Sequence, residues 1–292
     1  MTGHAHHDDR RRVLLALALT GAFTVVEVVA GIVTGSLALL ADAGHMLTDT
    51  LALGLAALAF RIGDLPADRR RSYGYQRFQI LAAFANAVAL ILIVGWICVE
   101  AVLRFLTPTP IAAEGMLFVA SAGLVVNIVC FAILHGGGHD NLNVQGAALH
   151  VLGDLLGSVA AIIAALVIIY TGWLPIDALL SVFVAMLVLR SAWILLKRSA
   201  HILLEGTPDR LDVDAMCAAL REKIPAVASA HHVHVWGLTQ ENLMLTMHVV
   251  LADDCSDPGE VVRQVKALLT ADFDIRHSTI EVEAGRCADH ND

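Results

Sequence analysis

Apolar stretches follow one another between residues 13 and 196, each long enough to cross a membrane as a helix. Glycine, proline and polar residues separate them, as at Gly35-Ser36 after the first stretch and Gly136-Gly137-Gly138 after the fourth. The predicted helices are Val13–Thr34, Leu37–Arg61, Phe78–Leu106, Met116–Leu134, Leu142–Tyr170 and Leu174–Leu196. The pattern therefore predicts a polytopic α-helical membrane domain with six transmembrane helices.

The pattern changes after residue 206. Leu211–Ile224 has the periodicity of an amphipathic helix, and Asp257-Pro258 is an N-cap before a second helix that runs to about Leu269. Alternating segments predict three strands, at His232–Leu238, Leu243–Leu251 and Ser278–Glu283. The order αββαβ predicts a small two-layer α+β domain, which would gain stability from dimerisation or a bound metal.

These two patterns divide the chain into five predicted parts. They are a His-containing N-terminal segment (1–12), the membrane domain (13–198), a linker (199–206), a metal-binding and dimerisation domain (207–284) and a C-terminal tail (285–292).

Basic residues predict the orientation of the membrane domain. Arg10, Arg11 and Arg12 precede the first predicted helix, five arginines lie between 61 and 77, and Lys197-Arg198 follow the sixth. All three groups fall on one side of a six-helix topology, and only Arg104 lies near the other. Because basic loops stay on the cytoplasmic side, both termini are predicted to be cytoplasmic.

Composition agrees with a membrane protein. The chain has 292 residues, 57% of them hydrophobic, and a mean hydropathy of +0.70. Its whole net charge of −9 falls on residues 205–292, which hold 16 acidic and 7 basic residues. This acidity argues against nucleic-acid binding and suits the attraction of cations. Five cysteines with no CxxC pair predict no disulfide framework.

One short motif, H-x-L-x-D-x-L, occurs twice inside the predicted membrane helices. Its first copy contains His45 and Asp49, and its second contains His150 and Asp154. Residues four apart share a helix face, so each copy presents an imidazole and a carboxylate together. A single buried histidine is often only a packed core residue, but two identical pairs predict one four-coordinate site of the kind zinc prefers.

The donor types narrow the chemistry. Hard ions such as magnesium and calcium prefer oxygen alone, whereas imidazole binds zinc only when deprotonated and so allows protons to compete. The motifs of common enzyme classes, such as HExxH, Gx4GK[ST] and GxSxG, are absent from the sequence. Four protein ligands suit transport better than catalysis, which keeps an open position. The chain is therefore predicted not to be an enzyme, and an intramembrane metalloenzyme stays as an alternative.

Other polar residues in the predicted membrane helices allow three interpretations. Glu27, Asp42 and Asn127 hydrogen-bond between helices, lie at the membrane interface or belong to an access path, and Asp42 is also placed to support His45. The same alternatives hold for Asn86, Glu100 and Asp177.

The predicted C-terminal domain is rich in histidine. His231, His232 and His234 cluster at the start of a strand, His248 lies near the end of the next, and His277 precedes a strand with Glu283. A soluble metal site is predicted here, although strand residues in solvent are the simpler alternative. Strand alternation favours His232 or His234 over His231. The N-terminal His4, His6 and His7 predict at most loose metal binding.

Several segments carry a resemblance to a known family. The chain resembles the cation diffusion facilitator family, and within it bacterial zinc exporters related to cobalt–zinc–cadmium resistance proteins. The resembling segments are 36–49, Tyr73-Gly74-Tyr75-Gln76-Arg77-Phe78, 150–158 and 231–236.

The resemblance implies a fold, an assembly and an activity. It implies a Y- or V-shaped homodimer in the bacterial inner membrane, with six-helix protomers and a cytoplasmic domain of ferredoxin-like, metallochaperone type. It also implies export of Zn²⁺ from the cytoplasm in exchange for protons, by alternating access, with zinc as a regulatory ligand as well. Cobalt and cadmium stay open as substrates. A metal-regulated membrane sensor or scaffold is the rival function.

The resemblance also implies site residues. His45, Asp49, His150 and Asp154 match the transport site. His231, His248 and Glu283 resemble the cytoplasmic site, with His277 as a candidate fourth ligand. Part of the family has a further loop site made of one aspartate and two histidines; here Asp68 is present, but Arg71 and Tyr75 replace the histidines, so that site is predicted to be absent.

Overall fold

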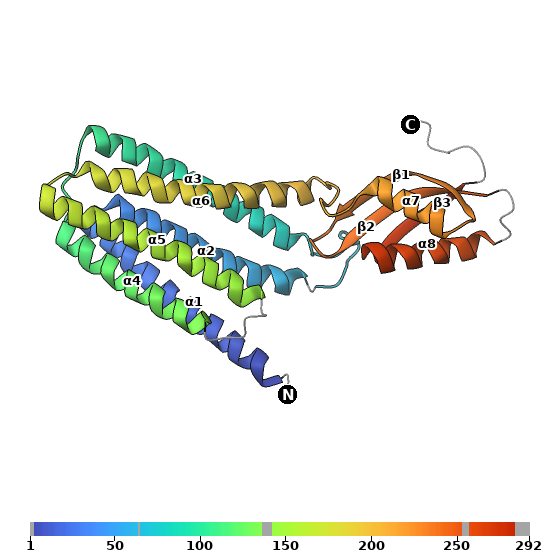
Figure 1. The fold of residues 1–292 in the computed structure, drawn as a ribbon, viewed down its shortest axis with the longest axis horizontal. Helices are drawn as coiled ribbons and strands as arrows, with labels where there is room; N and C mark the ends of the chain where they lie inside the picture. The colour runs from blue at the N-terminus through green and yellow to red at the C-terminus, as the bar shows by residue number, and fades with distance from the viewer. Residues whose placement is uncertain (1–2, 64, 136–141, 253–256, 284–292) are drawn as a thin grey trace. The chain divides into compact units, whose positions relative to one another are not determined.

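The computed structural model describes residues 3–63, 65–135, 142–252 and 257–283 (Figure 1). The chain forms two compact units. The first comprises Met1–Ala56 and Ala85–Leu196, and the second comprises Ala57–Phe84 and Lys197–Asp292.

Long helices make up the first unit and extend into the second. Their bounds are α1 Gly3–Thr34, α2 Leu37–Gly63, α3 Phe78–Leu106, α4 Ala113–His135, α5 Leu142–Thr171 and α6 Pro175–Leu203. The helices α1 and α2 are separated at Gly35-Ser36, where Gly35 has a φ of 73°. A residue with a Cβ would be strained in that conformation, so glycine allows the chain to turn back here.

Two of these helices extend far beyond the ends that the sequence pattern predicts. Helix α1 begins at Gly3, so most of the polar segment 1–12 is helical, because no glycine or proline interrupts residues 4–20. Helix α6 continues to Leu203, so the first half of the predicted linker 199–206 is helical as well. The helix ends at Leu203, and Glu205, two residues later, has a φ of 60°.

Among the residues that the structure describes, four helical segments are long and apolar enough to cross a membrane. They are Phe78–Leu106, Ala113–Ile133, Asp154–Thr171 and Pro175–Leu203. Within the described residues, α1 and α2 contribute shorter apolar segments, Ala18–Thr34 and Leu37–Leu47. The protein is therefore a multi-pass membrane protein, and the six-span topology stays a prediction.

Helix α2 lies between two groups of helices in the first unit (Figure 1). On one side, Leu37 and Ala41 pack with residues of α3 and α6. On the other side, Ala38 and Leu39 pack with residues of α1, α4 and α5. A helix that is buried on two faces requires apolar residues on both, as the sequence of α2 provides.

A three-stranded sheet with two helices forms the C-terminal part of the second unit (Figure 1). The elements are α7 Val213–Lys223, β1 Val227–Gly237, β2 Leu243–Leu251, α8 Pro258–Phe273 and β3 His277–Glu283. The sheet order is β1-β2-β3, with β2 antiparallel to β1 and parallel to β3. Because parallel neighbours need a crossover, α8 connects β2 to β3.

The core of this domain lies between the helices and the sheet. Met216 and Leu220 of α7 and Val265 and Leu269 of α8 are buried in one apolar cluster, together with Leu245 and other residues of the strands. Both helices have side-chain N-caps, Asp212 for α7 and Asp257 for α8. The predicted element order αββαβ is therefore the observed one, although β1 begins five residues earlier than predicted.

Candidate metal centre

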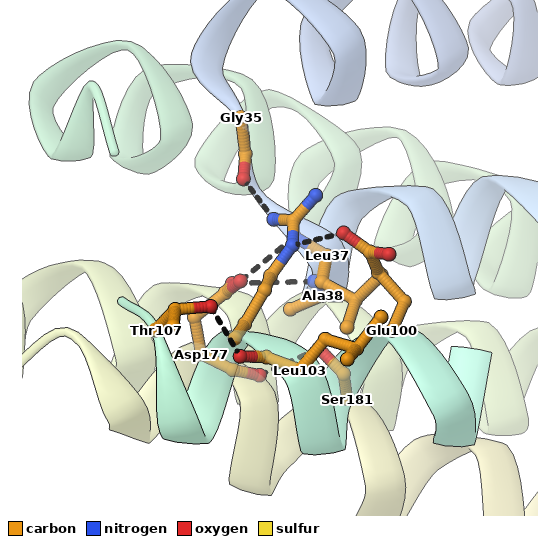
Figure 2. A network of polar contacts seen from close by, with 9 residues as sticks. Gly35, Leu37, Ala38, Glu100, Leu103, Thr107, Asp177 and Ser181 are labelled. Carbon is orange, nitrogen blue, oxygen red and sulfur yellow. Dashed lines mark hydrogen bonds and ion pairs between the residues drawn. The ribbon is translucent and has the colours of Figure 1, made fainter. Parts of the chain in front are cut away.

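The start of α2 is fixed by a carboxylate from α6 (Figure 2). Asp177 accepts hydrogen bonds from the backbone nitrogens of Leu37 (2.7 Å) and Ala38 (3.2 Å) and from the Ser36 hydroxyl (2.8 Å). The first turn of a helix leaves its N–H groups without partners, and here another helix supplies the acceptor. Asp177 thus anchors the helix that carries His45.

A basic residue balances this buried carboxylate. Arg104 of α3 donates to the carbonyl oxygen of Gly35 and, at 2.9 Å, to Glu100. Its positive charge also acts on Asp177. The network joins α2, α3 and α6 at one end of the first unit, and a hydrogen bond between helices is one of the interpretations that the sequence allows for Asp177.

The structure brings together one histidine and one carboxylate of the duplicated motif. His45 Nε2 on α2 lies 4.0 Å from Asp154 Oδ1 on α5. The His45 side chain is 18% exposed and the Asp154 side chain 2%, so both lie largely inside the helical unit. Ligand atoms of a tetrahedral zinc site lie about 3.3 Å apart, because each is about 2.0–2.1 Å from the metal. The observed separation is close to that requirement.

The other two predicted ligands share these helices. Asp49 follows His45 by one helical turn on α2, and His150 precedes Asp154 by one turn on α5. The side chains of Asp49 and His150 lie outside the described residues. Their participation in the same site stays a prediction from the spacing.

A second group of metal-binding side chains lies in the sheet domain. Ligand atoms of His231, His248 and Glu283 all lie within 4.8 Å of one another. His248 Nδ1 is 2.8 Å from Glu283 Oε1, and His231 Nε2 is 3.3 Å from Glu283 Oε2. Two imidazoles and a carboxylate at these distances fit zinc, which would replace the present contacts with the carboxylate.

A β-bulge explains why His231 belongs to this group. His231 pairs with His248 and His234 pairs with Thr246, so two residues of β1 lie opposite a single residue of β2 between those pairs. His232, within the bulge, has a φ of 51°. A bulge changes which side chains share a face, so simple alternation, which favoured His232 or His234, was misleading here. His232 instead stacks on His248, with ring centroids 4.9 Å apart.

The structure places His277 away from this group. His277 pairs with Met244 at the start of β3, whereas Glu283 pairs with Val250 at its end. The two residues are six positions apart along the strand, which corresponds to about 20 Å. The His277 ring contacts Tyr73, with centroids 6.1 Å apart.

The loop before α3 has no metal group of its own among the described residues. Arg71 donates to the Tyr75 hydroxyl, which in turn donates to Asp68, both at 3.0 Å. The Arg71 guanidinium also lies 4.5 Å from the centre of the Tyr75 ring. Backbone N–H groups of Arg70 and Arg71 hold the pKa of Asp68 below its ordinary value. These contacts occupy the aspartate that a loop metal would need.

Comparisons with known proteins decide the family. The family profile described as "Cation efflux transmembrane domain" matches residues 13–204, and that described as "Cation efflux protein, cytoplasmic domain" matches residues 208–285. The chain belongs to the cation diffusion facilitator family. Membership in this family of transporters, which are not enzymes, confirms the prediction that the chain has no enzymatic role.

Similar curated proteins extend over nearly the full chain. "Zinc transporter ZitB" of Escherichia coli strain K12 is 48% identical, covering 98% of this chain and 91% of that protein. "Metal cation efflux system protein CzcD" of Cupriavidus metallidurans is 44% identical, covering 98% and 91%. "Cadmium, cobalt and zinc/H(+)-K(+) antiporter" of Bacillus velezensis is 40% identical, covering 99% and 92%.

A solved structure, "Metal-bound C-terminal domain of the CzcD transporter", is also similar to this chain. It is 34% identical and covers 25% of this chain and 99% of its own, with a TM-score of 0.23.

Proposed function

We propose that this protein exports Zn²⁺ from the bacterial cytoplasm in exchange for protons, by alternating access. Family membership and the zinc exporters among its relatives support metal export. The Bacillus relative is named as an H(+)-K(+) antiporter, which supports exchange of the metal for another cation. The observation that carries the proposal is the 4.0 Å approach of His45 and Asp154 inside an apolar helical unit.

The substrate site would consist of His45, Asp49, His150 and Asp154. Its two carboxylates would offset the positive charge of zinc as the ion loses its hydration shell. Its two imidazoles would bind zinc only without their protons, so each binding event would compete with protonation. Nitrogen donors also disfavour magnesium and calcium, which prefer oxygen. Cobalt and cadmium remain substrates to be tested beside zinc, since relatives are named for them.

Alternating access would depend on α2 and α5, which carry all four ligands. Asp177 anchors the first turn of α2 to α6, whereas the two ligands on α2, His45 and Asp49, lie two to three turns further along the helix. A helix held at one end and packed on both faces can tilt about that end with little loss of hydrogen bonds. We therefore place the pivot of α2 at Asp177. The positive-inside pattern supports six spans with both termini cytoplasmic.

The sheet domain would act as a zinc-dependent clamp in a homodimer. Two copies bring together twice the net charge of −9, and this repulsion favours separation. Zinc at His231, His248 and Glu283 would add positive charge and join β1, β2 and β3. The match of this domain to the profile named ZT_dimer supports a homodimer, and the proximity of His231, His248 and Glu283 supports zinc binding in each copy.

A transport assay separates this function from a sensor, a scaffold and an intramembrane metalloenzyme. Purified protein in liposomes is given a zinc-sensitive dye inside and an imposed pH gradient. Exchange predicts zinc entry that follows the direction of the gradient and fails in Asp154→Asn. Glu100→Gln is the matched control, because it makes the same kind of change in the Arg104 network. Zinc entry that is independent of the pH gradient would refute proton exchange. The absence of any zinc entry would refute transport.

A further inference from the structure

Two carboxylates inside the first unit lie beyond the duplicated motif. Glu27 on α1 is 0% exposed and Asp42 on α2 is 1% exposed. None of their four oxygens accepts a hydrogen bond from the described residues. An ionised carboxylate that is buried without a partner is highly unfavourable, and inside a membrane such groups mark ion pathways. A cation bound between the two groups would offset part of this cost.

A neutral oxygen donor, the side-chain amide of Asn127, lies on α4. Asn127 of α4 is 0% exposed, and its Nδ2 donates to the Ser158 hydroxyl of α5 at 3.2 Å. Its Oδ1 has no hydrogen-bond donor among the described residues. The Asn127 amide is thus held by α5, and its oxygen remains available to bind a cation.

Two glycines make room for these groups. A Cβ on Gly123 of α4 would lie 2.9 Å from Glu27 Oε1 and 3.3 Å from Ser158 Oγ. A Cβ on Gly157 of α5 would overlap the carboxylate of Asp42. The helices therefore approach one another closely where the carboxylates lie, and any larger residue at either glycine would displace them.

The predicted zinc ligand Asp154 is electrostatically linked to this pair. Its charge acts on both Glu27 and Asp42, and the charges of those two also act on one another. The other titratable groups described around them are His45, beside Asp154, and the Cys130 thiol on α4, which also interacts with Asp154. A divalent ion at Asp154 would therefore change how strongly the pair holds a positive charge.

We propose that Glu27, Asp42 and Asn127 form an oxygen-donor site for one singly charged cation, which is displaced when zinc binds at Asp154. The cation is a proton or an alkali-metal ion, either of which removes one of the two negative charges of the ionised pair and suits oxygen donors. This inference rests on the proposed function, and it assigns a place to the counter-ion. Zinc repels the bound cation through Asp154, and the cation returns when zinc leaves, so this cation exchanges with zinc without sharing its ligands, in addition to the protons that leave the two imidazoles.

The test counts ions released by zinc in the purified full-length protein. His248→Ala is the background, because it removes a ligand of the sheet-domain group. Zinc is added at pH 7 in weak buffer containing a pH indicator, with potassium, sodium or N-methyl-D-glucamine as the only other cation. The cluster variant is Glu27→Gln with Asp42→Asn, and Glu100→Gln is the control for a carboxyl-to-amide change elsewhere.

The expected result distinguishes the two cations. If a proton is the cation, the cluster variant releases about one proton fewer per zinc than the background and the control. If an alkali-metal ion is the cation, zinc affinity falls in potassium or sodium for the background but not for the cluster variant. Asn127→Asp, which adds a carboxylate while leaving the pair intact, should raise whichever response is seen. It also serves as the second variant if the double variant fails to fold.

The inference would be overturned if zinc still bound and the background, the cluster variant and Asn127→Asp showed equal proton release and equal alkali dependence. Zinc binding that Asp154→Asn leaves unchanged would refute the proposed transport site, and this inference with it. Failure of this inference and failure of the proposed transport site would therefore appear in different measurements.

Discussion

Asp177 of α6 accepts a 2.7 Å hydrogen bond from the backbone nitrogen of Leu37, the first residue of α2. These residues are 140 positions apart in the chain, so the contact joins two distant helices. Because α2 carries His45, the position of a predicted zinc ligand depends on a carboxylate on a different helix. The relationship gives the first prediction.

Asp177→Ala should destabilise the membrane unit. The change leaves buried N–H groups of Leu37 and Ala38 without an acceptor, and each such loss costs about 1–3 kcal/mol. The apparent melting temperature of the detergent-solubilised protein measures the effect. Asp177→Asn, which keeps one acceptor oxygen, should be less severe, and equal melting of all three proteins would contradict the capping role.

Zinc affinity at the membrane site should fall with acid. Each imidazole must be neutral to bind the metal, and the reference pKa of histidine is about 6.5, so affinity should drop most between about pH 7.5 and 5.5. Calorimetric titration of the His248→Ala protein, in which the sheet-domain group lacks a ligand, measures this dependence. A flat pH profile would exclude histidine ligands from the site.

Zinc should draw the two sheet domains of a dimer together only by binding His231, His248 and Glu283. Spin labels on the two sheet domains of a dimer should move closer on zinc addition in the wild type and not in His248→Ala. His277→Ala is the matched control, since His277 lies at the other end of β3 from Glu283, and it should respond like the wild type. The clamp is rejected if His248→Ala responds fully, or if the wild type does not respond.

The bulge in β1 predicts opposite behaviour for two adjacent histidines. His232→Gly should keep zinc binding, because glycine adopts the positive φ of that position more readily than histidine, by roughly 1–2 kcal/mol. His231→Gly should lose it, because a ligand is removed. Bound zinc is counted in an Asp154→Asn background, which silences the membrane site. Loss in both variants alike would show that His232 is also a ligand.

The sequence predicted helices wherever apolar length and a clear break coincided. Gly35-Ser36 marked the end of α1 because few residues other than glycine tolerate that turn. The two H-x-L-x-D copies were visible because helix periodicity fixes which residues share a face, although only His45 and Asp154 are described together. Apolar length did not predict where α1 begins or α6 ends, since polar residues can extend a helix beyond the membrane.

Contacts between distant residues were not predictable from spacing. Nothing in the local sequence of Asp177 shows that it caps α2, because the partner lies on another helix. The positive φ of His232 shifts the alternation of β1, and no glycine marks that position. The closeness of Glu27 and Asp42 to Asp154 likewise depends on packing at Gly123 and Gly157.

The central claim is that one zinc ion binds between α2 and α5. X-ray absorption at the zinc edge measures its ligands directly, on protein loaded with one equivalent of zinc in a His231→Ala, His248→Ala background. The account predicts four nitrogen or oxygen neighbours at about 2.0–2.1 Å, with the imidazole signal of two histidines. That signal should fall by half in His45→Ala. A six-coordinate shell of oxygens alone, or an imidazole signal unchanged in His45→Ala, would contradict it.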